Sequence, residues 1–80
     1  MSFYTYILFS KSKGKYYTGS TSDIKKRISY HNNSNKGFTS HASDWCLVYL
    51  AKFETVQEAR IQEKNIKKRG AFRFLNDNST

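Results

Sequence analysis

Acidic residues are scarce in this chain of 80 residues, which has six Asp and Glu against fourteen Lys and Arg and a net charge of +8. So few carboxylates argue against a site for two metal ions, because such a site needs several carboxylates around ions about 3.5–4 Å apart. The positive charge favours a polyanionic partner, with nucleic acid ahead of an anionic membrane surface. A basic surface that serves only solubility is the plainer alternative. No predicted helix pairs a long apolar face with a basic one, so we expect no membrane binding.

Cysteine is nearly absent as well, because Cys46 stands alone and excludes an intramolecular disulfide. This composition suits a reducing compartment. Cys46, His31 and His41 lack the spacing of a zinc site. Since Cys46 lies in an apolar segment, we expect it to be a small core residue.

Long apolar runs are missing too, and the longest one, which ends at Ala51, is far too short to span a bilayer. The N-terminal segment has no basic residue before its apolar stretch and no small-residue cleavage site, so it does not resemble a signal peptide. We therefore expect a cytoplasmic protein.

The length predicts a single domain over residues 1–80, with a core over about 3–75 and a frayed tail over 76–80. Thirteen aromatic residues (one Trp, six Tyr and six Phe) compensate for a modest apolar fraction, because each of them buries a large area.

A β-hairpin is predicted at the N-terminus, where residues 3–10 and 15–20 are rich in strand formers and flank a Lys/Gly turn. A loop of four residues would place Leu8 opposite Tyr17 and Tyr6 opposite Gly19. Tyr6 and Tyr17 would then be diagonal neighbours on one face of the sheet, with open space beside the Tyr6 hydroxyl.

Two helices are predicted after the hairpin. Ser20 and Asp23 resemble a capping box, so the first helix should begin near residue 21 or 22. Thr55 and Glu58 repeat that pattern before the second helix, which Gly70 should end.

The remaining segments complete the predicted order. Residues 32–44 are polar and predict a long loop, whereas residues 45–53 form an apolar run typical of the central, most buried strand. Residues 71–76 predict a short last helix. The order is therefore β-β-α-β-α-α, an α/β (α+β) chain.

Five polar residues are hard to explain by packing alone. Arg27 and His31 continue the inner side of the first helix, and Glu63 lies on the inward stripe of the second, where a lone carboxylate is costly unless a cation or metal meets it. Each has a plainer explanation: Tyr6 and Tyr17 as partly buried strand residues, Arg27 paired with Glu63, and His31 as a packing residue. Together they are less easily dismissed, because two separate helices turn polar groups towards the sheet.

These residues follow a recognisable order. "YTYIL", then "YYTG", then a helix with "RISYH" and a later glutamate resemble the GIY-YIG endonuclease superfamily, and its small standalone members in particular. Residues 4–6 take the place of GIY and residues 17–19 that of YIG. Tyr4 replaces the Gly and Thr18 the Ile of those motifs, changes expected to alter packing more than chemistry.

The resemblance implies a small three-stranded antiparallel sheet flanked by helices and a metal-dependent endonuclease that hydrolyses phosphodiester bonds. It implies that Tyr6 is the general base, that Tyr17 assists it, that Arg27 contacts the scissile phosphate and that His31 lies near the reacting groups. Glu63 would hold a single divalent metal, Mg²⁺ or Mn²⁺. One carboxylate suffices for an ion that keeps much of its water shell, and the metal and nearby cations such as Arg27 would favour the Tyr6 phenolate.

Nucleic acid is the expected partner, with DNA favoured over RNA, and binding should depend strongly on salt and little on sequence. A partner protein could supply specificity. The alternatives are a non-catalytic nucleic-acid-binding module with this fold and a domain that binds an acidic protein. The expected nucleic-acid-binding residues are Lys11, Lys13, Lys15, Lys25, Lys26, Lys36, Lys64 and Lys67.

Overall fold

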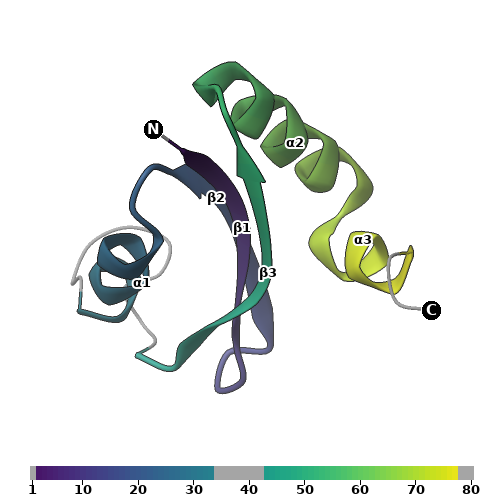
Figure 1. The fold of residues 1–80 in the computed structure, drawn as a ribbon. Coiled ribbons are helices and arrows are strands. Elements are labelled where there is room, and N and C mark those ends of the chain that lie inside the picture. The colour runs from purple at the N-terminus through teal and green to yellow at the C-terminus, as the bar shows by residue number, and fades with distance from the viewer. Residues whose placement is uncertain (1, 34–42, 78–80) are drawn as a thin grey trace.

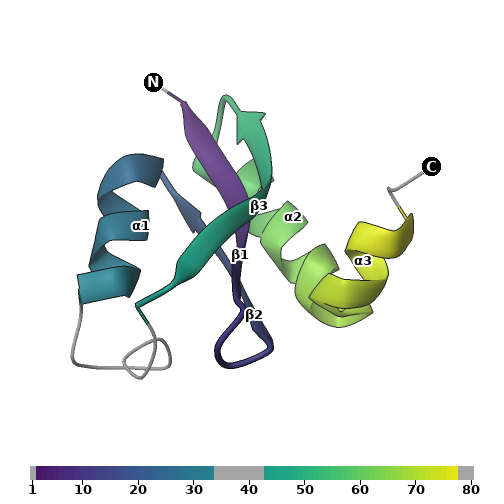
Figure 2. The same cartoon turned by 90° about the horizontal axis from the view of Figure 1, so that it is seen from below.

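The computed structural model describes residues 2–33 and 43–77 (Figure 1). Its elements are β1 (Phe3–Ser10), β2 (Lys15–Thr21), α1 (Ile24–Asn33), β3 (Trp45–Phe53), α2 (Val56–Arg69) and α3 (Ala71–Asp77), in the predicted order. Figures 1 and 2 show α1 on one face of the sheet and α2 with α3 on the other. Among the helices of the described residues, none is long and apolar enough to cross a bilayer.

The sheet is antiparallel with the strand order β2-β1-β3. The turn between β1 and β2 has the four residues predicted for it, so Tyr6 lies opposite Gly19 and Leu8 lies opposite Tyr17. Because side chains alternate along a strand, Tyr6 and Tyr17 share one face of the sheet. The predicted register of the hairpin is confirmed.

The central strand is β1 rather than β3, contrary to the prediction from the apolar run. Both neighbours pair with β1, which leaves β3 at an edge of the sheet. Leu47, Val48 and Leu50 keep 39–44% of their surface exposed, and Cys46 is exposed as well. The expectation of a buried Cys46 was therefore wrong, because a continuous apolar segment does not by itself identify the middle of a sheet.

One hydrophobic layer lies between the sheet and α1. Tyr6, Leu8 and Trp45 are buried there, and Ile24 and Ile28 of α1 pack against them. The helix begins two or three residues later than predicted, because its first backbone amides are capped by another residue. The Asp23 carboxylate accepts from the Lys26 amide at 3.1 Å, whereas Ser20 remains in β2.

The second layer lies between the sheet and α2. Thr5 faces this helix and donates its hydroxyl to the Ala59 carbonyl at 2.6 Å, both residues being fully buried. The predicted cap is confirmed, since Thr55 accepts from the Glu58 amide. Gly70 ends the helix with a φ of +94°, a conformation that favours glycine.

Helix α3 extends one residue beyond its predicted end. Asp77, expected in a frayed tail, is helical. Asp77 forms a two-point ion pair with Arg69, with distances of 2.8 and 3.0 Å. This pair joins the end of α3 to the end of α2.

Candidate active site

Tyr6 and His31 form the buried centre of the candidate site. The Tyr6 hydroxyl and His31 Nε2 are 3.0 Å apart, and the two residues are only 1% and 3% exposed. Burial and the nearby Arg27 charge lower the pKa of His31. Burial, together with Tyr17, raises the pKa of Tyr6 well above its ordinary value. Both directions favour a hydrogen bond between a neutral phenol and a neutral imidazole.

Tyr17 completes the aromatic group. Its ring centroid lies 4.5 Å from that of His31 and 6.3 Å from that of Tyr6. Gly19 makes room for this arrangement, since a Cβ at this position would lie 2.6 Å from the Tyr6 hydroxyl and 3.2 Å from Tyr17 Cε2. The space expected beside Gly19 is therefore filled by the Tyr6 hydroxyl.

Arg27 lies one helical turn before His31 on α1 and is exposed. Its guanidinium carbon is 5.7 Å from the centre of the Tyr30 ring, and its positive charge lowers the pKa of both His31 and Tyr6. The guanidinium is thus close enough to act on both groups and accessible to a ligand. Among the ion pairs of the described residues, Arg27 is not paired with Glu63. The plainer explanation of Arg27 and Glu63 as a structural ion pair therefore does not hold.

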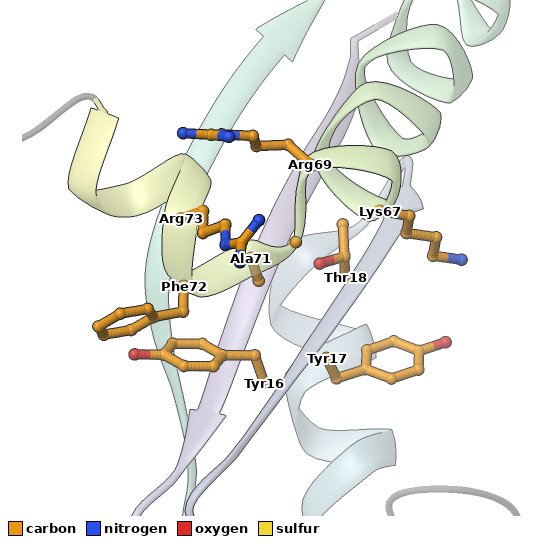
Figure 3. A pocket seen from close by; sticks show the side chains of 9 residues that line it. Tyr16, Tyr17, Thr18, Lys67, Arg69, Ala71, Phe72 and Arg73 are labelled. Atoms are coloured by element: carbon orange, nitrogen blue, oxygen red, sulfur yellow. The ribbon is translucent and has the colours of Figure 1, made fainter.

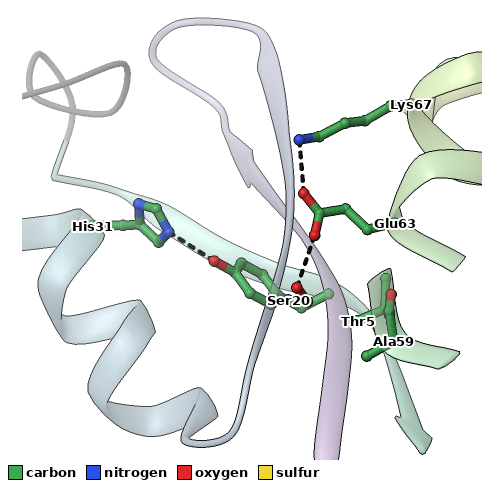
Figure 4. A network of polar contacts seen from close by, with 7 residues as sticks. Thr5, Ser20, His31, Ala59, Glu63 and Lys67 are labelled. Atoms are coloured by element: carbon green, nitrogen blue, oxygen red, sulfur yellow. Dashed lines mark hydrogen bonds and ion pairs between the residues drawn. The ribbon is translucent and has the colours of Figure 1, made fainter. Parts of the chain in front are cut away.

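Glu63 reaches the same edge of the sheet from the opposite face. Ser20 donates its hydroxyl to Glu63 Oε1 at 2.8 Å, and the Lys67 ammonium lies 2.7 Å from Oε2 (Figure 4). The Glu63 side chain remains 21% exposed, and its negative charge contributes to the raised pKa of Tyr6. The inward orientation predicted from the helical pattern is confirmed, and its partners are Ser20 and Lys67.

Strand β2 is the element that brings the two parts of the site to one edge of the sheet: the aromatic group with Arg27, and the Glu63 carboxylate. As an edge strand it presents Tyr17 and Gly19 to one face and Ser20 to the other, so residues from α1 and α2 approach the same backbone segment. Tyr6, Tyr17, Arg27 and His31 come from the α1 side, whereas Glu63 comes from the α2 side. Ser20 was missed as a site residue, although its strand parity, opposite Thr5, would have placed it on the α2 face.

The metal-binding capacity of this site rests on one carboxylate. The described part of the chain contains no cluster of three or more His, Cys, Asp or Glu side chains that could hold a metal ion. Glu63 nevertheless fits an ion such as Mg²⁺, which keeps several waters and binds one or two carboxylates plus substrate phosphates. Its carboxylate is partly exposed, and its charge is near enough to the aromatic group to help raise the pKa of Tyr6.

The predicted basic residues are distributed around this centre. Lys64 and Lys67 line a hollow that also contains Glu63, and Lys26 lines another one together with Arg27. The other predicted lysines of the described residues are exposed at the hairpin turn and on α1: Lys11, Lys13, Lys15 and Lys25. Lys36, and with it most of the predicted loop 32–44, lies outside the described residues. Arg60 and Arg73 line hollows that border this edge and were not predicted.

Comparison with known proteins agrees with the geometry. The chain matches the GIY-YIG catalytic domain over residues 2–76. It is 41% identical over 66 residues to the UPF0213 protein CPE1444 of Clostridium perfringens (strain 13 / Type A), which amounts to 81% of this chain and 70% of that protein. The solution NMR structure of the UPF0213 protein BH0048 from Bacillus halodurans is similar with a TM-score of 0.52 and 33% identity, over 85% of this chain and 72% of the other. The chain therefore belongs to the GIY-YIG family, and both of these relatives are UPF0213 proteins.

Proposed function

We propose that this protein is a metal-dependent endonuclease that hydrolyses phosphodiester bonds in nucleic acid, with DNA favoured over RNA. The observation that carries the proposal is the convergence at one sheet edge of a buried Tyr6–His31 pair, an accessible guanidinium and a partly exposed carboxylate. A nuclease needs these three elements: a proton acceptor, a phosphate ligand and an anchor for a cation.

Arg27 is the phosphate ligand of this proposal. A guanidinium can donate two parallel hydrogen bonds to a phosphate, and it stabilises the negative charge that develops on phosphoryl oxygens in the transition state. Arg27 is exposed, so it is accessible to a phosphate in the hollow that it lines. Lys26, which lines the same hollow, adds positive charge for the neighbouring backbone.

Proton transfer in this proposal involves both members of the buried pair. The expectation that nearby cations would favour the Tyr6 phenolate does not hold for the protein alone, because burial and Tyr17 outweigh Arg27 and raise the pKa of Tyr6. His31 supplies the missing acceptor, since its lowered pKa keeps it neutral at neutral pH. Tyr6 would give its proton to His31 Nε2 as it takes one from the attacking water.

A divalent cation held by Glu63 would stabilise negative charge on the phosphate and the leaving oxygen. For this role Glu63 must exchange the Lys67 ammonium for the ion, while Ser20 continues to orient the carboxylate from β2. The released ammonium is then available to a phosphate.

The second candidate function is nucleic-acid binding without cleavage. It is favoured by the observation that both oxygens of Glu63 already accept hydrogen bonds and that Tyr6 is a fully buried phenol. In that case the basic hollows around the edge would bind nucleic acid, and the aromatic group would be part of the core.

A cleavage assay distinguishes the two. Supercoiled plasmid, single-stranded and branched DNA and RNA are incubated with Mg²⁺ or Mn²⁺, or with a chelator, using wild type, Tyr6→Phe and Glu63→Gln. We expect metal-dependent cleavage that falls by about 10²-fold or more in both variants. Tyr4→Phe and Glu54→Gln are matched controls that should cut like wild type. Binding with no cleavage under any of these conditions would refute the enzyme and support the module.

A further inference from the structure

We propose that the hollow between β2 and α3 is a binding site for one unpaired base of a nucleic acid, next to the phosphate that the proposed nuclease cuts. The hollow has a volume of about 830 Å³, within the range of roughly 300–1,000 Å³ that small-ligand sites occupy. Its lining combines aromatic and basic residues with no acid: Tyr16, Tyr17, Thr18, Lys67, Arg69, Gly70, Ala71, Phe72 and Arg73 (Figure 3). The position of this base beside the cut rests on the proposed function, whereas the capacity of the hollow to bind a base does not.

Phe72 and Tyr16 form a stacking surface in this hollow. Phe72 is 60% exposed, and its ring centroid lies 6.4 Å from that of Tyr16. Tyr16 is supported from behind by Phe9, at 4.7 Å between ring centroids. Figure 3 shows the Tyr16 and Phe72 rings next to each other among the residues that line the hollow. Exposed aromatic rings on a fixed support are what single-strand-binding proteins use to stack bases.

Helix α3 does not need Phe72 for its attachment. Phe74 packs edge-on against Tyr49 of β3, at 5.0 Å between ring centroids, and Arg69 forms the two-point ion pair with Asp77. These contacts fix the helix from its other side and its end. Phe72 is therefore held in place while most of its surface remains open to a ligand.

The charges around this stacking surface fit a nucleotide backbone. Arg73 takes part in no hydrogen bond or ion pair among the described residues, and its guanidinium extends into the hollow (Figure 3). Lys67 lines the hollow and also contacts Glu63. Arg69 is paired with Asp77 and Lys67 with Glu63, so Arg73 is the residue of this hollow that would meet a phosphate when no metal ion is bound.

The hollow borders the candidate active site. Tyr17 lines it, with its ring centroid 4.5 Å from that of His31, and Lys67 lines it and lies 2.7 Å from Glu63. In this proposal, a strand with a phosphate at Arg27 crosses β2 and places a nearby unpaired base on Phe72. A base inside a duplex cannot present its face to a protein ring without leaving the stack. The inferred substrate class is nucleic acid with an unpaired nucleotide beside the cut.

Binding measured in a chelator tests the site without any cleavage. A short fluorescent single-stranded DNA and its duplex are titrated with wild type, Phe72→Ala and Val48→Ala, a control that removes an apolar side chain 44% exposed on β3, outside the hollow. We expect Phe72→Ala to weaken single-strand binding by roughly 5- to 100-fold, with duplex binding changed less than about twofold. Val48→Ala should match wild type. Arg73→Ala should weaken binding more than Lys68→Ala, which removes the same charge outside the hollow.

A spectroscopic readout separates stacking from a structural role of Phe72. An oligonucleotide with a single 2-aminopurine should lose fluorescence on binding wild type or Phe72→Trp, and keep it with Phe72→Leu, which retains an apolar side chain. Equal binding and equal quenching by Phe72→Ala, Phe72→Leu and wild type would overturn the base site, even if the enzyme cuts. If wild type cuts nothing but binding still depends on Phe72, the nuclease proposal fails and the base site stands.

Discussion

Gly19→Ala should disrupt both the core and the candidate site, because the position has no space for a side chain. The new Cβ would lie 2.6 Å from the Tyr6 hydroxyl and 2.8 Å from Tyr6 Cζ. Tyr6 cannot swing aside easily, since it is 1% exposed and its hydroxyl is bonded to His31. The φ of Gly19 is outside the left-handed region, so lack of space rather than backbone strain decides the outcome.

The expected magnitude follows from three contributions. Overpacking costs about 1–3 kcal/mol, and loss of the Tyr6–His31 hydrogen bond costs about 0.5–1.5 kcal/mol. Replacing glycine lowers the entropy of the unfolded chain, which offsets about 0.4–1 kcal/mol. The free energy of unfolding should thus fall by roughly 0.5–4 kcal/mol, and each kcal/mol should lower Tm by about 4–8 °C in a chain of this size.

A double-mutant cycle of Gly19→Ala and Tyr6→Phe, measured by urea unfolding, tests whether the added Cβ clashes with Tyr6. In a Tyr6→Phe background the closest contact is gone and the ring has lost its anchor, so Gly19→Ala should cost about 1 kcal/mol less than in wild type. Gly14→Ala is the control, because nothing lies within 4 Å of its added Cβ and its cost should add to that of Tyr6→Phe within about 0.5 kcal/mol. An unchanged urea midpoint for Gly19→Ala, or no coupling to Tyr6→Phe, would refute the reasoning.

Three further predictions concern the groups around the sheet. The pKa of His31 is lowered in the folded protein, so the unfolded chain binds more protons below about pH 6.5, and the free energy of unfolding should decrease as the pH falls through that value. His31→Gln should reduce this dependence on pH in urea titrations between about pH 5 and 7.5. An equal pH dependence in the variant and wild type would count against this prediction. Thr5→Val should cost about 1–2 kcal/mol by removing the buried bond to the Ala59 carbonyl, whereas Thr5→Ser should recover most of the loss, and a wild-type Tm for Thr5→Val would contradict this. The Asp44 carboxylate accepts a hydrogen bond from the Ser10 hydroxyl, which lowers the pKa of Asp44. The stabilisation that Asp44 provides should be present at neutral pH and lost as the pH falls below about 3.8. The Tm of Asp44→Ala should therefore differ from that of wild type only above about pH 3.8.

The sequence was sufficient to predict the hairpin and the aromatic half of the site. Loop parity decides which face each strand residue takes, so Tyr6 and Tyr17 could be placed together from the four-residue turn alone. Helical periodicity placed His31 and Glu63 on inward sides for the same local reason. What these patterns share is that each depends on neighbours along the chain.

The errors arose where distant segments decide. The order of strands depends on which strand pairs with both others, and nothing in residues 45–53 reveals that β1 does so. Ser20 satisfies a capping pattern locally but is extended, because β1 pairs with it and Glu63 accepts its hydroxyl. The raised pKa of Tyr6 is likewise a property of the assembled core, in which burial outweighs the nearby guanidinium.

The outer border of β2 has a consequence for regulation. Groups from opposite sides of the sheet converge across this single strand, and its backbone has no partner strand among the described residues on that side. On the proposed mechanism, a peptide that extended the sheet along β2 would cover the reactive groups and inhibit competitively with nucleic acid. A peptide that extended the sheet along β3 instead would leave turnover intact. An inhibitor should therefore bind at the β2 edge, whereas a partner that only holds the protein in place could bind at the β3 edge.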